Sequence, residues 1–353
     1  MKAAVVEALG LIAVKDVPDP VLLEGSLLIR VEACAICGSD IRIFRKGDPR
    51  ATLPRIIGHE IAGVVEAIGE GTAGFAVGDR VTVAPGHGCG ACRWCRTGMG
   101  NVCVDPRPSV GYASSGGFAE LIVPPVNVVA NGFVNHIPEG MSFEHASMAE
   151  LLACCINGQE RAAVGKGDTV LVMGAGPAGC MHVELARARG ATKVLLSQRS
   201  KARLDMAAER FHPDATFAGE GPALADWVMA ETGGFGADVV IVAAPSAKAQ
   251  EAAIPLCAPR GRINFFGGLP KDDRHITIDA NVIHYKEIAL TGASSSLGRQ
   301  NREALDLIAR GLVHADRYIT YRFPLERAAE AFAVVEARQA IMVVVMPRSG
   351  RPA

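Results

Sequence analysis

Short runs of β-branched and aliphatic residues alternate with turn residues through the first 125 positions. The four clearest runs, separated by glycine, proline or aspartate, cover residues 27–33, 61–69, 79–85 and 119–125. This spacing is typical of a mostly β region that forms a barrel-like sheet. After Pro138 the spacing becomes helical and predicts a helix over residues 141–162 with Ser142 as its N-cap.

From Asp168 onward, strand-like runs alternate with helical segments. Further strands are expected over residues 169–174, 193–197, 238–244, 261–267 and 287–293. An alanine- and arginine-rich helix is expected over residues 179–190. This alternation favours parallel β-α-β units in a doubly wound sheet. We expect the helix at 301–311 and the strand at 341–347 to return to the first region.

Length and charge restrict the possible functions. The chain has 353 residues, 49% of them hydrophobic and 21% charged, which is enough for two domains with full cores. Its net charge of −1 supplies no global field for nucleic acid or an anionic membrane. Glu7 interrupts the N-terminal apolar run, and no run approaches the ~20 residues of a membrane span. We therefore expect a cytoplasmic protein with neither nucleic acid nor membrane as a partner.

Four of the ten cysteines form one cluster with C-x2-C-x2-C-x7-C spacing: Cys89, Cys92, Cys95 and Cys103. Four thiolates satisfy a tetrahedral zinc ion, and two-residue gaps allow a tight loop to surround it. A closed shell of four sulfurs has no open position, so this metal would be structural. Iron–sulfur ligation and a set of unrelated buried thiols are the alternatives.

A second group of metal-binding residue types is dispersed along the chain. Cys37 lies in ICGSD, His59 and Glu60 lie in IIGHEIAG, and Glu150 lies in the helical segment SMAELLAC. Such residues from distant segments can bind a catalytic zinc that keeps room for water or substrate. Spacing alone does not show that they meet. Taken singly, they also fit a core thiol, a core histidine and a solvated helix residue.

The stretch GAGPAG follows a strand-like run and opens a helix. Gly174 would permit the tight turn, Gly176 would let the backbone approach a pyrophosphate, and Gly179 would let the helix pack against the strand. The helix N-terminus then presents free N–H groups to phosphate. A bare glycine turn is the alternative, but the strand before it and the helix after it favour a dinucleotide site.

Cations gather just beyond the second strand of this region. Gln198 stands about twenty residues after the glycine turn, where a carboxylate would bind the adenine ribose of NAD. Arg199 follows directly, and Arg203 comes about one helical turn later. A guanidinium suits a 2′-phosphate, so the stretch favours NADP over NAD. The alternative is a solvated basic helix start, which the helix dipole disfavours.

Together these motifs resemble the zinc-dependent medium-chain dehydrogenase/reductase superfamily. The resemblance rests on an ordered set: CGSD at 37–40, GHE at 58–60, GDRV at 78–81, the four cysteines, GGFAE at 116–120, AEL at 149–151 and GAGPAG at 174–179. GHE with a later helical glutamate is most similar to the polyol (sorbitol-type) and threonine dehydrogenase branch.

The resemblance implies an α/β fold that combines a GroES-like, mostly β catalytic domain with a Rossmann cofactor domain. The implied domains are residues 1–155, with a structural zinc lobe at 86–105, then 156–294 for the cofactor, and 295–353 returning to the catalytic domain. Members are commonly dimers or tetramers, so a homo-oligomer is expected.

Site residues also follow from the resemblance. Cys37, His59 and Glu150 match catalytic zinc ligands, Glu60 matches a ligand that binds directly or exchanges with water, and Ser39 matches the hydroxyl that passes on the substrate proton. The four cysteines match structural zinc ligands. The remaining cofactor positions are Pro177, Ala178, Ser197, Ala243, Phe266 and Gly267. Arg42 departs from the pattern, because relatives often carry a relay histidine there, whereas arginine stays protonated. The proton would then leave through Ser39 and water or ribose hydroxyls. Alternatively, Arg42 binds an anionic group of substrate or cofactor, or is a plain surface arginine.

The implied reaction is reversible hydride transfer between a polyol or other secondary alcohol and a nicotinamide cofactor, NADP more than NAD, with one catalytic and one structural zinc. A threonine-type amino-alcohol dehydrogenase is the nearest alternative. A non-catalytic cofactor-binding protein of this fold is another. A zinc-free quinone reductase of the same fold is a further alternative, but it would not explain the presence of Cys37, His59 and Glu150.

Overall fold

Two compact units make up the chain. The computed structural model describes residues 1–348. The first unit contains Met1–Ala153, Ser295–Gly311 and the chain from Tyr318 onward. The second contains Cys154–Ser294 and Leu312–Arg317. The helix and strand near the C-terminus thus belong to the same unit as the N-terminal strands.

The first unit is built on a seven-stranded sheet. Its strands follow the order β15-β16-β3-β5-β6-β8, and β7 pairs with β3 at one side. Their bounds are β3 Leu27–Ala35, β5 Glu60–Ile68, β6 Arg80–Val83, β7 Leu121–Ile122, β8 Val134–His136, β15 Ile319–Pro324 and β16 Met342–Met346. The mostly β interpretation of this region is therefore confirmed. The run expected over 119–125 pairs only briefly, because Pro124 and Pro125 lack the N–H donors that a ladder needs.

The first unit also contains helices, and one of them begins at the N-cap that the sequence predicted. Their bounds are α1 Gly38–Lys46, α2 Arg93–Arg96, α3 Val126–Ala130, α4 Phe143–Ser147, α11 Gly298–Ala309 and α12 Ala328–Glu336, with 3-10 turns at Gly100–Val102 and Leu325–Arg327. The helix expected over 141–162 is two helices, α4 and α5 (Ala149–Arg161). Ser142 is the N-cap of α4, as predicted, since the Ser142 Oγ accepts the N–H of His145 at 3.1 Å.

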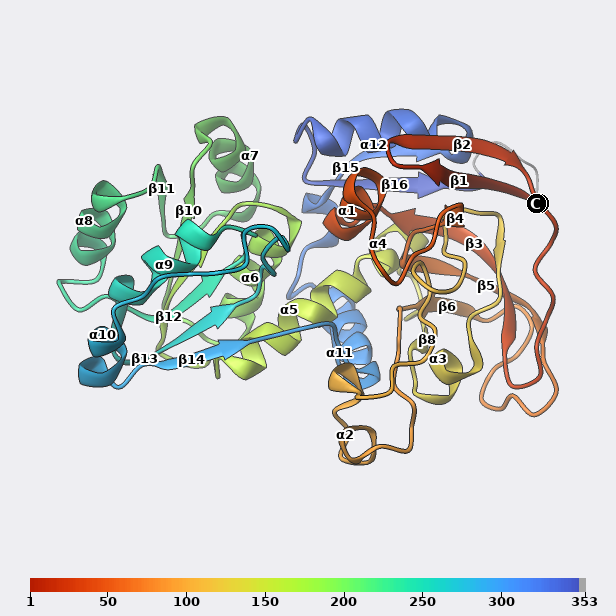
Figure 1. Ribbon diagram of the computed structural model, residues 1–353, viewed down its shortest axis with the longest axis horizontal. Helices are drawn as coiled ribbons and strands as arrows, with labels where there is room; N and C mark the ends of the chain where they lie inside the picture. Colours follow the sequence, from red (N-terminus) through yellow and green to blue (C-terminus); the bar gives the residue numbers. More distant parts are fainter. Residues whose placement is uncertain (349–353) are drawn as a thin grey trace. The chain divides into compact units, whose positions relative to one another are not determined.

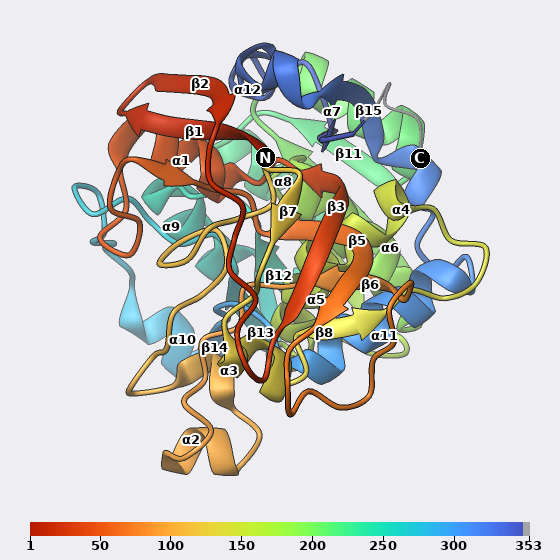
Figure 2. The ribbon, with the colours of Figure 1, turned by 90° about the vertical axis from the view of Figure 1, so that its right-hand side faces the viewer.

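A small sheet and an aromatic cluster join the two ends of the chain within this unit. The small sheet has the order β2-β1-β4, with bounds β1 Lys2–Ala8, β2 Leu11–Asp16 and β4 Arg55–Ile56. Both ribbon views show β1 and β2 beside α12 (Figures 1 and 2). Phe332 of α12 packs edge-on against Phe44 of α1 and Phe118, with ring centroids 5.3 and 5.5 Å apart. This apolar contact packs the returning C-terminal segment against α1 and the loop before β7.

The second unit is a doubly wound parallel sheet, as the alternating pattern predicted. Its strand order is β11-β10-β9-β12-β13-β14. The bounds are β9 Thr169–Met173, β10 Lys193–Gln198, β11 Ala215–Ala218, β12 Ala237–Val242, β13 Cys257–Phe265 and β14 Ala289–Gly292. Counted from β9, this is the 3-2-1-4-5-6 order of dinucleotide-binding folds. All these strands are parallel, but the order in which successive strands are added reverses between β9 and β12. Ligands of such sheets bind outside the carboxyl ends of the strands at that point.

Helices of the second unit cover both faces of its sheet (Figure 1). They are α6 Pro177–Ala188, α7 Lys201–Phe211, α8 Pro222–Glu231, α9 Ala247–Leu256 and α10 Ala280–Lys286, and a 3-10 turn covers Ala315–Arg317. The central strands are buried on both sides, so they read as continuous apolar runs instead of alternating ones.

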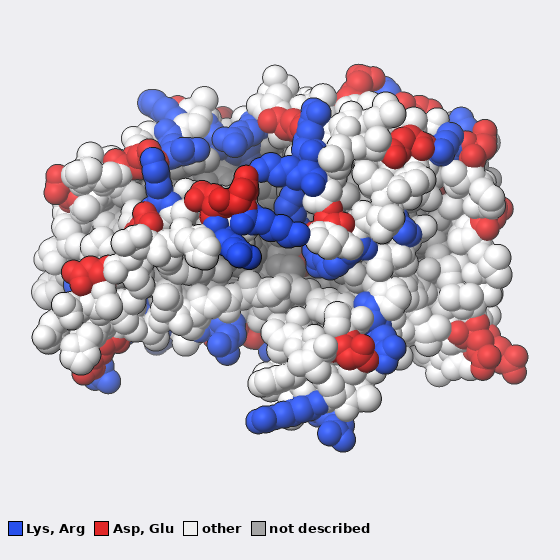
Figure 3. Space-filling model, in the orientation of Figure 1, with Lys and Arg blue, Asp and Glu red and all other residues white. Residues whose placement is uncertain are grey.

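Surface charge is mixed, in keeping with the net charge of −1. Figure 3 shows acidic and basic side chains interspersed over the visible face, with Lys and Arg on the lobe that carries α2. Arg93 and Arg96 of that helix are exposed. Among residues 1–348, no helix has both the length and the apolar character needed to cross a membrane.

Candidate metal centres and cofactor site

Cys37, His59 and Glu60 meet at one end of the β3–β5 ladder. In this antiparallel pair Ala35 lies opposite Glu60, so the residues just beyond each strand end become neighbours. The ligand atoms of Cys37, His59 and Glu60 all lie within 4.8 Å of one another. His59 and Glu60 are buried, whereas Cys37 is partly exposed. A thiolate, an imidazole and a carboxylate at this spacing form a donor set that suits zinc.

Asp40 holds two of these residues in place. Its Oδ2 accepts the backbone N–H of Cys37 at 2.9 Å, and its Oδ1 accepts that of Gly58 at 3.2 Å. The same Oδ1 lies 3.4 Å from Nδ1 of His59. Asp40 has no exposed surface. A carboxylate behind a ligating histidine fixes its ring and raises its basicity. Sequence reasoning missed this role, although Asp40 closes the CGSD motif.

Ser39 lies on the other side of the same imidazole. Its Oγ is 3.2 Å from Nε2 of His59. Asp40 and Ser39 thus approach different ring nitrogens of His59. The predicted position of a hydroxyl beside the metal ligands agrees with this geometry.

The Glu60 carboxylate is buried beside other acidic groups, which disfavours its negative charge. Burial raises its pKa well above the usual range, and Cys37 and Glu150 raise it further. Among residues 1–348, neither carboxylate oxygen has a hydrogen-bond partner. Two buried carboxylate oxygens without hydrogen-bond partners fit the coordination of a cation at this position. Glu150, in the first turn of α5, lies outside the set of three but is buried and acts on Glu60 through its charge.

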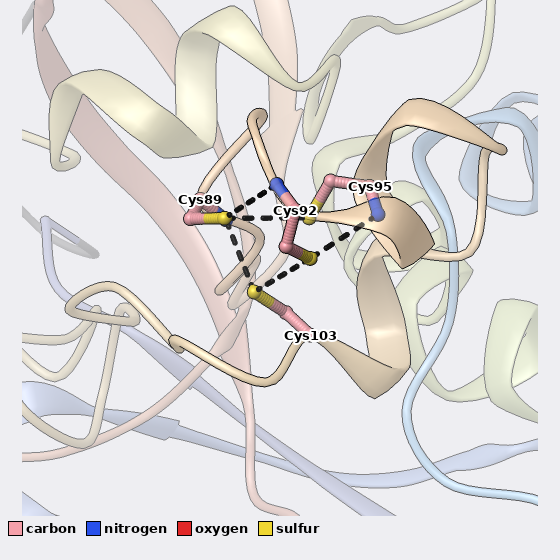
Figure 4. Close-up of side chains that lie close together, drawn as sticks. All are labelled: Cys89, Cys92, Cys95 and Cys103. Atoms are coloured by element: carbon pink, nitrogen blue, oxygen red, sulfur yellow. Dashed lines mark hydrogen bonds between the residues drawn. The ribbon is translucent and has the colours of Figure 1, made fainter.

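The four clustered cysteines converge as their spacing predicted (Figure 4). Cys89 and Cys95 have their sulfurs 3.9 Å apart, and Cys92 and Cys103 have theirs 3.8 Å apart. These distances are far beyond a disulfide bond but equal the ~3.8 Å edge of a sulfur tetrahedron around zinc, given Zn–S bonds of ~2.3 Å. The backbone N–H of Cys95 lowers the pKa of the Cys92 thiol to about 6, which favours the thiolate that a metal needs.

In the second unit, the glycine turn joins β9 to α6. The backbone N–H of Gly174 donates to the carbonyl of Ser197 at 2.8 Å, so β10 holds the turn. A Cβ on Gly179 would lie 1.8 Å from the Gly174 carbonyl oxygen, whereas one on Gly176 would meet no atom within 4 Å. Gly176 is the N-cap of α6, and Pro177 and Ala178 open its first turn. The open space over this N-terminus is a cradle for a phosphate.

Three other predicted cofactor residues follow the carboxyl ends of neighbouring strands. Ala243 comes after β12 and donates its N–H to Met173 of β9 at 2.9 Å. Phe266 and Gly267 come after β13, and the N–H of Gly267 donates to Val242 at 2.8 Å. Parallel strands end at one edge, so these residues share that edge with the glycine turn.

Arg199 and Arg203 have different environments. Arg199 follows β10 with its side chain 69% exposed, 3.9 Å from Glu220, whose side chain is also exposed. Arg203 is 9% exposed, and its Nε donates to the Ala175 carbonyl in the glycine turn at 2.8 Å. The side chain of Arg203, the second residue predicted to contact the phosphate, is therefore directed at the backbone of the glycine turn. Arg203 positions that backbone, and Arg199 is the cation that faces solvent beside Gln198.

Comparison with known proteins agrees with these features. A family model of the alcohol dehydrogenase GroES-like domain matches residues 23–135, and one of zinc-binding dehydrogenases matches residues 177–310. The sorbitol dehydrogenase of Halalkalibacterium halodurans is 29% identical over 96% of each chain. The L-threonine 3-dehydrogenase of Pyrococcus horikoshii is 32% identical over 94% of this chain and 93% of that protein.

Solved structures give the same result. A zinc-binding dehydrogenase from Sinorhizobium meliloti 1021 bound to NADP has a TM-score of 0.88 and 32% identity, covering 98% of this chain and 99% of that one. The resemblance inferred from the ordered motifs is confirmed. The chain belongs to the zinc-dependent medium-chain dehydrogenase/reductase superfamily, in its polyol and threonine dehydrogenase branch, and is an NAD(P)-dependent alcohol oxidoreductase.

Proposed function

We propose that this dehydrogenase oxidises a polyol or other secondary alcohol with NADP in preference to NAD, using a catalytic zinc held by Cys37, His59 and Glu150. Glu60 is a further ligand that binds directly or exchanges with water. A second, structural zinc is held by the four clustered cysteines. The observation that carries the proposal is the convergence of Cys37, His59 and Glu60 beside Ser39. The unpartnered Glu60 oxygens support a cation at that position.

A zinc ion at this centre would supply Lewis-acid compensation for the negative charge of an alkoxide. The residues of the chain do the rest. Oδ1 of Asp40 lies 3.4 Å from Nδ1 of the His59 ring, and Oδ2 keeps Cys37 in register by accepting its backbone N–H. Ser39 offers a hydroxyl that accepts the proton of the substrate alcohol. Arg42 stands in the position of the relay histidine, so the proton leaves through Ser39 and water or a ribose hydroxyl.

Cofactor binding is assigned to the second unit. The open N-terminus of α6 supports pyrophosphate binding at Gly176, Pro177 and Ala178. The apolar residues Ala243 and Phe266 at the carboxyl edge support a nicotinamide position there. Gln198 carries no charge, so it does not repel a 2′-phosphate, and the exposed Arg199, which lies 3.9 Å from Glu220, offers a guanidinium to one. The NADP-bound relative is a further support.

Arg199→Ala is expected to weaken NADP binding about 10- to 100-fold while changing NAD binding little, since a charge-assisted bond to phosphate is lost. Dissociation constants for both cofactors, measured by isothermal titration calorimetry, check this. Lys201→Ala is the matched control, because Lys201 is an equally exposed cation two positions on that pairs with Asp205. Equal loss for both cofactors, or a wild-type preference for NAD, would contradict NADP selection by Arg199.

The proposal as a whole is tested by metal analysis and a substrate panel. We expect about two zinc ions per chain and NADP-dependent oxidation of polyols. L-Threonine belongs in the panel, because the Pyrococcus relative acts on it by name and because an amino acid requires a site for both its carboxylate and its ammonium group. A protein with one zinc or none and no turnover of any alcohol would favour a cofactor-binding protein without catalysis.

Compartment and assembly are also proposals. None of the ten cysteines, all of which lie within residues 1–348, forms a disulfide bond, which suits a reducing cytoplasm where cysteine clusters bind metal. Membership of the family supports a homo-oligomer, and light scattering of the purified protein would measure its mass.

A further inference from the structure

A pair of arginines shares one carboxylate in the loop that follows α1. Arg50 donates through Nε to Oδ1 and through Nη2 to Oδ2 of Asp48, each at 2.9 Å. Arg42 of α1 approaches Oδ2 of the same carboxylate at 3.4 Å. The Arg50 guanidinium lowers the pKa of Asp48 below its usual range, so the carboxylate stays ionised. Two guanidinium cations and one carboxylate give the cluster of Arg42, Arg50 and Asp48 a net positive charge.

This pair lies beside the catalytic centre and not on a remote surface. The Arg50 guanidinium carbon is 4.2 Å from the centroid of the Tyr112 ring. The Tyr112 ring is in turn 5.2 Å from the centroid of His59. The distance from the Arg50 guanidinium carbon to the centroid of the His59 ring is therefore at most the sum of these two distances. The buried Tyr112 phenol also interacts with both Ser39 and Arg50, which connects the cation to the hydroxyl beside the metal ligands.

Both arginines keep surface for a ligand. The Arg42 and Arg50 side chains are 51% and 56% exposed, whereas Asp48 is only 8% exposed. The carboxylate thus lies beneath the two guanidinium groups and fixes them, while donors of the guanidinium groups remain open to solvent. Cations that are held rigid before a ligand arrives lose less entropy on binding it.

We propose that Arg42 and Arg50 bind an oxyanion carried by the substrate, so that the physiological substrate is a phosphorylated polyol. This inference rests on the proposed function, because it assigns the substrate class of the same site. The planar fork of arginine matches two oxygens of a phosphate monoester, and Tyr112 packs between the anion site and His59. The anion takes no part in the hydride transfer and serves only to position the carbon that is oxidised.

The test compares sorbitol, sorbitol 6-phosphate and the carboxylate analogue gluconate as substrates, with NADP saturating. We expect the wild type to use sorbitol 6-phosphate at least about tenfold more efficiently than sorbitol. Arg50→Gln and Arg42→Gln are expected to lower kcat/KM for the phosphate ester about 10- to 100-fold, mainly through KM, and to reduce the preference ratio. Arg50→Lys is expected to restore part of it. A preference for gluconate over both other compounds would identify a carboxylate as the oxyanion.

Arg45→Gln is the matched control, because Arg45 is an exposed arginine of the same helix that pairs with Glu336. It is expected to keep the wild-type ratio. Inorganic phosphate gives an independent measurement, since it should compete with sorbitol in the wild type and lose this effect in Arg50→Gln.

Three results would overturn the inference: equal wild-type efficiency on neutral and anionic substrates, an equal fall on both in Arg50→Gln, or a matching rise in the NADP dissociation constant, which would assign the arginines to the cofactor. Each of these presumes an active enzyme. Absence of turnover on every alcohol would instead contradict the proposed function, so the two failures are distinguishable.

Discussion

His59→Ala and Cys37→Ser are each expected to remove the catalytic metal and to lower kcat/KM about a thousandfold or more, equivalent to roughly 4 kcal/mol of barrier. Both side chains contribute ligand atoms to the set of three formed with Glu60, and neither change touches the four-cysteine cluster. Zinc content should fall from about two ions per chain to about one. Metal analysis and steady-state kinetics on the same preparations check both numbers.

Two further variants, Asp40→Asn and Cys257→Ala, distinguish loss of the catalytic metal from loss of the fold. Asp40→Asn keeps all ligands but replaces the carboxylate behind His59, and a 10- to 100-fold loss in activity or zinc affinity is expected. Cys257→Ala is the control, because Cys257 is a buried thiol of β13 in the second unit, outside both metal sets. It should keep both zinc ions and wild-type turnover. Full zinc content and unchanged turnover in His59→Ala would remove His59 from the ligand set.

Much of the fold follows from local patterns. Alternating strand and helix runs predict the parallel sheet of the second unit, because each β-α-β step is completed within a few tens of residues. The pattern fails where two signals compete. Strand propensity at 119–125 is overruled by Pro124 and Pro125, and the helical spacing over 141–162 hides a break at Met148, which ends α4.

The site is harder to predict, because its contacts join distant segments. Spacing identifies Cys37 and His59 as candidate ligands, but only the register of β3 with β5 brings them together. Asp40 belongs to the CGSD motif, but the motif does not show what its carboxylate contacts, and Tyr112 is a lone tyrosine outside any motif. Their roles depend on lying next to His59 in space.

Arg203 illustrates the same limit in the cofactor unit. In the sequence it belongs to a run of cations and resembles Arg199. In the fold, the helical turn between them directs Arg203 inward to the Ala175 carbonyl, whereas Arg199 stays exposed at the end of β10. Sequence proximity therefore assigns one role to two residues whose environments are opposite.

Gly176→Ala and Gly179→Ala are expected to fail for different reasons, although both glycines belong to one motif. A methyl group on Gly179 would lie 1.8 Å from the Gly174 carbonyl oxygen, so the turn must shift. We expect a loss of roughly 1–3 kcal/mol in the free energy of unfolding, with lower melting temperature in cofactor-free protein. A methyl group on Gly176 meets nothing within 4 Å, and its φ of −78° is open to alanine. That variant should melt close to the wild type without cofactor.

For NADP affinity, the informative variant is Gly176→Ala. The space above Gly176 is what a pyrophosphate would fill at the N-terminus of α6, so alanine there should weaken NADP about tenfold or more while the fold stays intact. Gly165→Ala is the control, because Gly165 lies before β9, at the opposite end of that strand, with only the Ala163 carbonyl 3.9 Å away. It should change neither melting nor binding. If Gly176→Ala bound NADP like the wild type, the pyrophosphate would lie elsewhere, because a contact that close has no room for a methyl group.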